Sequence, residues 1–73
     1  MADRRLQVFS TVARLLSFTK AAEALHMTQP AVTFQIRQLE DYFNTRLFDR
    51  THNRISLTTA GHLVKDYSGQ IIS

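Results

Sequence analysis

Residues 19–39, TKAAEALHMTQPAVTFQIRQL, decide the fold of this chain of 73 residues. The spacing of their apolar residues predicts two helices that meet at a sharp angle around residues 26–28. Ala22 is small, which lets the two helix backbones approach closely where they cross. Thr28 is a favourable cap for the second helix, and Pro30 falls in its first turn, where a missing backbone N–H costs nothing. The stretch therefore predicts a helix–turn–helix that projects its second helix from the domain surface.

The segments before this unit and within it carry apolar stripes that predict where the core lies. A first helix is expected over residues 4–16, and its stripe consists of Leu6, Phe9, Val12, Ala13 and Leu16, widened by Val8 and Leu15. Either Ser17 or Thr19 caps the helix that follows. The inward stripe of the second helix of the unit consists of Val32, Ile36, Leu39 and Phe43.

Two short segments and a final helix are predicted after this unit. Residues 46–50 and 54–57 flank a polar turn, so they predict a β-hairpin, which forms a wing. From Thr59 onward a helical apolar stripe recurs, and the rest of the sequence does not easily cover it. The predicted fold is thus mainly α: a winged helix–turn–helix with a three-helix core and a short hairpin, followed by one more helix.

Composition limits the classes of function. Nine basic against six acidic residues give a net charge of +3, which suits a polyanionic partner without proving one. The absence of cysteine excludes disulfides and thiolate metal sites, and the three histidines fall on separate predicted elements, so we expect no metal. No apolar run reaches the roughly 18 residues that a membrane span needs. No spacing suggests a catalytic triad, so we expect that the protein is not an enzyme. Without a membrane span, we also expect it to be cytoplasmic and to have no membrane partner.

The outward face of the second helix of the unit predicts contact with DNA bases. Gln29, Thr33 and Phe34 lie in its first turns, the part that reaches base edges in such motifs. Glutamine pairs with adenine, and threonine or phenylalanine packs on a thymine methyl group. The alternative is that Gln29 is a solvated polar residue and that Phe34 packs against a protein partner.

Basic residues near this helix predict contact with the DNA backbone. Lys20, Arg37, Arg50 and Arg54 are placed to straddle phosphates. At the tip of the hairpin, His52 and Arg54 fit a minor groove, since narrow A·T tracts attract cations. The alternative for the tip is an ordinary solvent-exposed turn.

Two alternatives to DNA binding remain open at this stage. In the first, the two helices of the unit form a plain helical hairpin in a larger bundle. In the second, the chain is a protein-interaction module. In the module, Phe34 and the last helix dock on a partner and the positive charge is incidental.

The whole pattern resembles the N-terminal domain of LysR-type transcriptional regulators, from about Leu6 to Gly61. The resemblance is carried by SFTKAAEALHMTQPAVT at residues 17–33, followed by Ile36, Leu39, Glu40, Leu47, Phe48, Arg50, Leu57, Thr58, Ala60 and Gly61. Two departures stand at Asn44, where the family usually has glycine, and at Thr59, where it often has glutamate. Asparagine also adopts the left-handed conformation, and the lost glutamate removes only a modest helix-start charge.

The resemblance implies a bacterial regulator that binds double-stranded DNA sequence-specifically, as a homodimer on an inverted repeat. Residues 28–43 are then the recognition helix in the major groove, and residues 50–54 are the wing in the minor groove. Implied base contacts are Gln29, Pro30, Ala31, Thr33 and Phe34, with Phe34 at a variable position that tunes operator choice. Implied backbone or minor-groove contacts include Thr28, Arg50, Thr51, His52, Asn53 and Arg54.

The resemblance also implies how the chain is divided. Residues 1–58 form the DNA-binding domain, and residues 59–73 begin a linker helix that pairs two subunits. The expected dimerisation residues are Ala60, Leu63, Val64, Tyr67 and Ile71. Such regulators carry a larger effector-binding domain, which is expected to be missing here. The small-molecule co-inducer and the higher oligomer would belong to the full-length protein, and no cofactor is expected in this chain.

Overall fold

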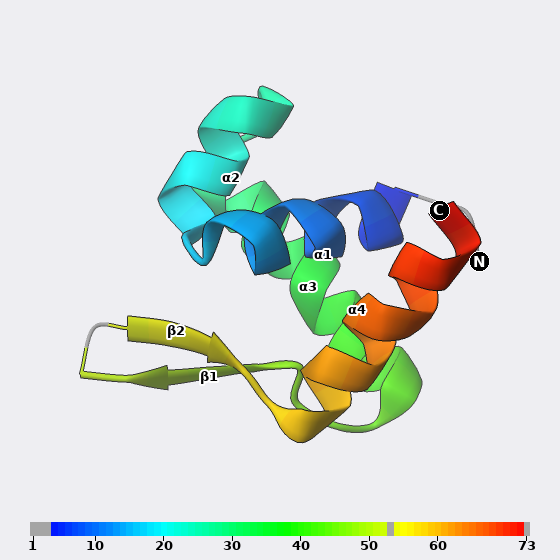
Figure 1. The fold of residues 1–73 in the computed structure, drawn as a ribbon. Helices are drawn as coiled ribbons and strands as arrows, with labels where there is room; N and C mark the ends of the chain where they lie inside the picture. Colours follow the sequence, from blue (N-terminus) through cyan, green and yellow to red (C-terminus); the bar gives the residue numbers. More distant parts are fainter. Residues whose placement is uncertain (1–3, 53, 73) are drawn as a thin grey trace.

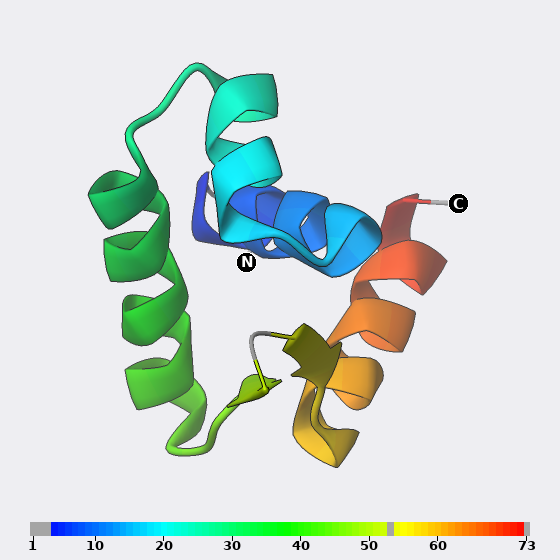
Figure 2. The same ribbon diagram turned by 90° about the vertical axis from the view of Figure 1, so that its left-hand side faces the viewer.

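The structure, a computed structural model, describes the backbone of residues 4–52 and 54–72, and the side chains of this range up to Tyr67. Figures 1 and 2 show a cluster of helices with a projecting hairpin. The elements are α1 (Arg4–Leu15), α2 (Phe18–Leu25), α3 (Gln29–Phe43), β1 (Phe48–Thr51), β2 (Arg54–Leu57) and α4 (Thr59–Ile72). This order confirms the mainly α, winged helix–turn–helix fold that the sequence predicts.

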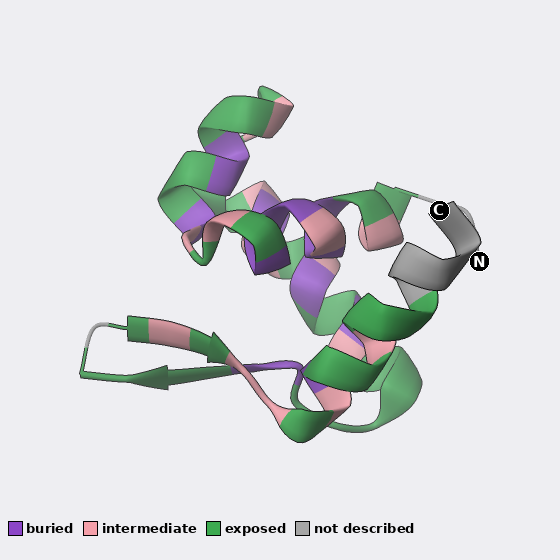
Figure 3. Ribbon diagram, in the orientation of Figure 1, coloured by how far each residue is buried: buried purple, intermediate pink, exposed green. Residues whose placement is uncertain are grey.

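The core lies where α1, α2 and α3 meet, which Figure 3 shows as buried segments turned toward one another. Its largest fully buried side chains are Phe9, Leu39, Leu47, Val8, Val12 and Val32. The prediction for Leu16 was wrong, because this residue follows α1 and is 47% exposed. Its φ of 50° is left-handed, a conformation in which helices often end. Val8, by contrast, is a central core residue.

Hydrogen bonds cap α2 at both of its ends and α3 at its start. The residue that caps the start of α2 is Ser17, not Thr19, since the Ser17 hydroxyl accepts a hydrogen bond from the Lys20 N–H at 3.1 Å. The helix ends at Leu25; the following His26 has a left-handed φ of 55°, and the Met27 N–H donates to the Ala22 carbonyl at 2.9 Å. This pairing satisfies carbonyls that a helix end otherwise leaves free. The Thr28 hydroxyl then caps α3.

The end of α3 repeats this geometry and sends the chain toward the wing. Asn44 has a φ of 54°, and the Thr45 N–H donates to the Glu40 carbonyl at 3.0 Å, so the expected left-handed helix end is confirmed. The core prediction for Phe43 was wrong, since it is 40% exposed. The last turn of α3 lies beyond the core that buries Leu39, and Phe43 instead packs edge-to-face on Tyr42 with ring centroids 5.1 Å apart.

The wing is a two-stranded antiparallel hairpin in which Phe48 pairs with Leu57 and Thr51 pairs with Arg54. Figure 1 shows it extending away from the helices. Phe48 is buried at its base, whereas the other residues of β1 are exposed. β1 begins at Phe48, two residues later than predicted, and the carbonyl of the preceding Arg46 accepts a hydrogen bond from the Thr58 hydroxyl at 2.6 Å.

The stripe of α4 has two faces. Ala60 and Val64 are partly buried against the core, whereas Leu63 and Tyr67 are 66% and 62% exposed. The side chain of Ile71 lies outside the described residues. Among the described helices, none is both long and apolar enough to cross a membrane.

Candidate nucleic-acid interface

The N-terminal half of α3 presents the five predicted base-contacting residues on an accessible surface. Gln29, Pro30 and Phe34 are exposed, and Ala31 and Thr33 are partly exposed. Phe34 is 57% exposed, although exposed aromatic surface is unfavourable in water. The positive end of the α3 dipole lies at the same end of the helix. This surface therefore combines apolar area, hydrogen-bonding groups and positive potential.

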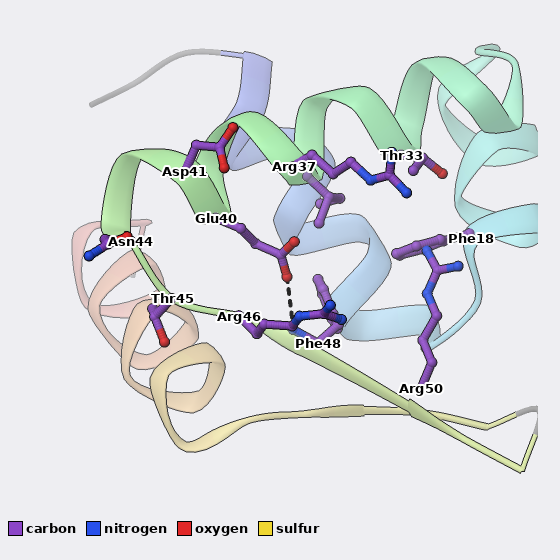
Figure 4. Close-up of a pocket in the computed structure, with 11 residues that line it drawn as sticks. Phe18, Thr33, Arg37, Glu40, Asp41, Asn44, Thr45, Arg46, Phe48 and Arg50 are labelled. Carbon is purple, nitrogen blue, oxygen red and sulfur yellow. Dashed lines mark hydrogen bonds between the residues drawn. The ribbon is translucent and has the colours of Figure 1, made fainter.

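A groove of about 570 Å³ runs between α3 and the base of the wing. We call it the wing groove. Its lining residues are Phe18, Thr33, Ile36, Arg37, Glu40, Asp41, Asn44, Thr45, Arg46, Phe48 and Arg50. Figure 4 shows that the lining side chains come from both α3 and the β1 side. Three of them are arginines, so cationic groups lie on both sides of the groove.

Arg50 is held in place by an aromatic ring. Its guanidinium carbon lies 4.0 Å from the centroid of the Phe18 ring, a cation–π contact between the wing and α2. Phe18 itself packs edge-to-face on Phe48, with ring centroids 5.9 Å apart. Stacking leaves the in-plane N–H groups of a guanidinium available to an anion. The sequence reasoning did not assign Phe18 a role, because its partners lie about thirty positions away.

Glu40 connects α3 to the start of the wing. Its Oε2 atom accepts a hydrogen bond from the Leu47 N–H at 2.9 Å and a longer one from the Phe48 N–H at 3.5 Å. Sequence reasoning also gave this residue no role. The sequence signal for such a role was weak: an acidic residue directly after Leu39, a residue of the inward stripe.

The structure brings some of the predicted backbone-contacting residues together and separates others. Thr33, Arg37 and Arg50 line the wing groove. Elsewhere, Lys20 is exposed on α2, the Thr28 hydroxyl accepts the Ala31 N–H at 3.2 Å, and the wing exposes Thr51, His52 and Arg54. Asn53 lies outside the described residues. Among the side chains of residues 4–52 and 54–67 there is no group of three or more histidine or carboxylate residues placed to hold a metal ion.

Comparison with known proteins identifies the family. Residues 4–62 match the model of the bacterial regulatory helix-turn-helix protein, lysR family. The RuBisCO operon transcriptional regulator of Allochromatium vinosum is 52% identical over 68 residues, which are 93% of this chain and 22% of that protein. The regulator HdfR of Salmonella newport is 46% identical over 73 residues, all of this chain and 26% of that protein. The chain thus spans about a quarter or less of these relatives.

Solved structures agree with this match. A LysR-family transcriptional regulator from Eggerthella lenta is 40% identical, with a TM-score of 0.90 over 94% of this chain and 99% of that one. The CbnR DNA-binding domain, solved in complex with DNA, is 36% identical, with a TM-score of 0.89 over 99% of this chain and 83% of that one. The family model covers most of the chain, and the resemblance noted in the sequence is confirmed: the chain belongs to the lysR family of bacterial regulatory helix-turn-helix proteins.

Proposed function

We propose that this chain is a double-stranded-DNA-binding domain of a bacterial transcription regulator. The N-terminal half of α3 enters the major groove, which is wide enough for a helix, and the wing reaches the adjacent minor groove. The wing groove is the observation that carries the proposal. Neighbouring grooves of a duplex are separated by one phosphate backbone, so the strand lies along the wing groove and meets Arg37 and Arg50.

The predicted contact residues divide into two roles under this proposal. Base contacts come from Gln29, Pro30, Ala31, Thr33 and Phe34, and backbone or minor-groove contacts from Lys20, Thr28, Arg37, Arg50, Thr51, His52, Asn53 and Arg54. The fold shared with a domain solved in complex with DNA supports DNA binding, and the division of roles stays a prediction. Because its DNA target would lie in the bacterial nucleoid, we expect the protein to be cytoplasmic and to have no catalytic activity. A small-molecule co-inducer and a higher oligomer stay predictions.

Fluorescence anisotropy of labelled mixed-sequence duplexes tests DNA binding itself. We expect binding at about 50 mM salt that weakens steeply toward about 200 mM, because phosphate contacts release counterions. Absence of binding at the lower salt would contradict the proposal and favour the protein-interaction module, for which the exposed Phe34 would be a docking residue.

Replacing Arg50 with alanine should weaken binding to every duplex by a similar factor. Because one phosphate contact is lost, the slope of log affinity against log salt should fall by about 1. Arg50→Lys should keep the salt slope but lose affinity, since lysine lacks the planar group that stacks on Phe18. Anisotropy titrations at several salt concentrations measure both quantities.

The matched control is Arg14→Ala, which removes an equal charge from an exposed position in the last turn of α1, outside the wing groove. If the two alanine variants reduce the salt slope equally, Arg50 contributes only to the net charge and has no phosphate contact of its own.

We also propose that two copies pair through the outer face of α4. Leu63 and Tyr67 are one helical turn apart and both are exposed, so they form an apolar surface that a second α4 can cover. Ala60 and Val64 are partly covered by the core of their own subunit, which makes their share in pairing smaller. Ile71 is expected to extend the same surface.

The double variant Leu63→Asp, Tyr67→Asp should therefore be monomeric under conditions in which the unaltered chain sediments as a dimer. His62→Asp, Lys65→Asp is the control, because it adds two carboxylates at exposed polar positions of the same helix. Sedimentation equilibrium distinguishes the species. Dimers that persist in the Leu63, Tyr67 variant would show that another surface pairs the subunits.

A further inference from the structure

The base of the wing is held on two sides at one residue, Leu47. The Leu47 N–H donates to the Glu40 carboxylate of α3 at 2.9 Å, and the Leu47 carbonyl accepts from the Thr58 N–H at 3.1 Å, just before α4. Figure 4 shows the longer bond to the same carboxylate, from the Phe48 N–H, between α3 and the start of the wing. A side chain of α3 thus bonds directly to the backbone at the base of the wing.

Glu40 makes this connection with both of its acceptor groups. Its backbone carbonyl accepts the Thr45 N–H, and its carboxylate accepts the N–H of Leu47 two residues later. The turn between α3 and the wing is thus fastened at each end to the same residue. Leu47 and Phe48 are buried, so their N–H groups need a protein partner, and a charged acceptor makes the stronger kind of bond.

The position of this carboxylate is unfavourable for a surface that meets phosphates. Glu40 lines the wing groove together with three arginines, and a negative charge there repels a polyanion. The carboxylate instead accepts hydrogen bonds from the backbone at the base of the wing, which indicates a structural role. A helix and a hairpin that occupy adjacent DNA grooves must be held at one relative orientation, because a small error moves one of them out of contact.

We propose that Glu40 is a positioning residue that fixes the wing to the recognition helix, so that the minor-groove and major-groove contacts form together. It touches backbone N–H groups of its own chain and not the DNA. This inference rests on the proposed DNA-binding function, and its test separates the two.

The test compares Glu40→Ala with Glu40→Gln on one selected duplex. Both variants lose the negative charge, but glutamine keeps an oxygen that accepts the Leu47 N–H. In hydroxyl-radical footprints we expect Glu40→Ala to retain the protection due to α3 and to lose the minor-groove protection due to the wing. Glu40→Gln should retain both. Asp41→Asn controls for removing a charge from the same groove.

A double-mutant cycle with Arg54 measures the coupling. Arg54→Ala should weaken binding about tenfold in the unaltered chain, but less than about twofold in the Glu40→Ala background, where the wing is already released. Thermal unfolding checks that the variants are folded. If Glu40→Ala does not fold, Glu40→Asp replaces it, because the shorter side chain keeps the charge but withdraws the acceptor from Leu47.

The outcomes are distinct. No binding by the unaltered chain would overturn the proposed function. The positioning role alone would be overturned if the unaltered chain binds DNA and the Glu40 variants show two results. These are full minor-groove protection by the wing and an undiminished loss of affinity on Arg54→Ala. Tighter binding by both Glu40→Ala and Glu40→Gln would likewise overturn it, because the carboxylate would then act only through its charge.

Discussion

Replacing Gln29 with alanine should weaken binding to the best duplex by about 1–3 kcal/mol and relax the base preference at one position of the site. Gln29 is exposed in the first turn of α3, where side chains reach base edges in the major groove. A glutamine amide donates one hydrogen bond and accepts another, which matches the edge of adenine. Binding curves on the selected site and on its single-base variants measure the effect.

Gln38→Ala is the control, because Gln38 is an exposed glutamine of the same helix, about two and a half turns further on and so on the opposite side. It should bind all these duplexes as the unaltered chain does. If Gln29→Ala lowers affinity equally for the best site and its variants, Gln29 does not read a base.

Replacing Gly61 with alanine should destabilise the domain by about 1–3 kcal/mol, as overpacking does. A loss of stability is unusual for this substitution, because alanine is favoured over glycine in a helix interior by about 1 kcal/mol. At Gly61, however, an added Cβ would overlap the Leu47 carbonyl oxygen and lie 2.9 Å from Leu57 Cδ2. A backbone carbonyl held by the Thr58 N–H cannot easily move aside. In a domain this small the loss is a large part of the roughly 3–5 kcal/mol a single core supplies.

Denaturant unfolding measures this change, and His62→Ala provides the comparison. His62 is the next residue of α4 and is exposed, so alanine there gains helix propensity without a clash. We expect the midpoint to fall for Gly61→Ala and to stay or rise for His62→Ala. An alanine at position 61 that leaves the midpoint unchanged would contradict the packing of α4 against Leu47.

Local patterns predicted most of the fold. Thr28 and Pro30 fixed the start of α3, and Asn44 its end, because capping depends on a few neighbouring residues. The errors at Leu16 and Phe43 have a common cause. Each extends an apolar stripe past the last turn that the core covers, and periodicity alone does not show where the neighbouring elements end.

The candidate site was less accessible to sequence reasoning. The exposed face of α3 followed from helical periodicity, and exposure of Phe34 agrees with it. The Phe18–Arg50 stack and the Glu40–Leu47 hydrogen bond join residues of different elements, which no local pattern reveals. The sequence showed the apolar stripe of α4. It did not show that Val64 packs against the core while Leu63 remains exposed.

Selection of bound sequences from a pool of random duplexes tests whether α3 reads DNA sequence. We predict that one short motif is enriched over successive rounds, at a salt concentration that suppresses binding through phosphates alone. Recovery of a pool that binds but remains random in sequence would contradict it, because the domain would then hold the backbone without reading the bases.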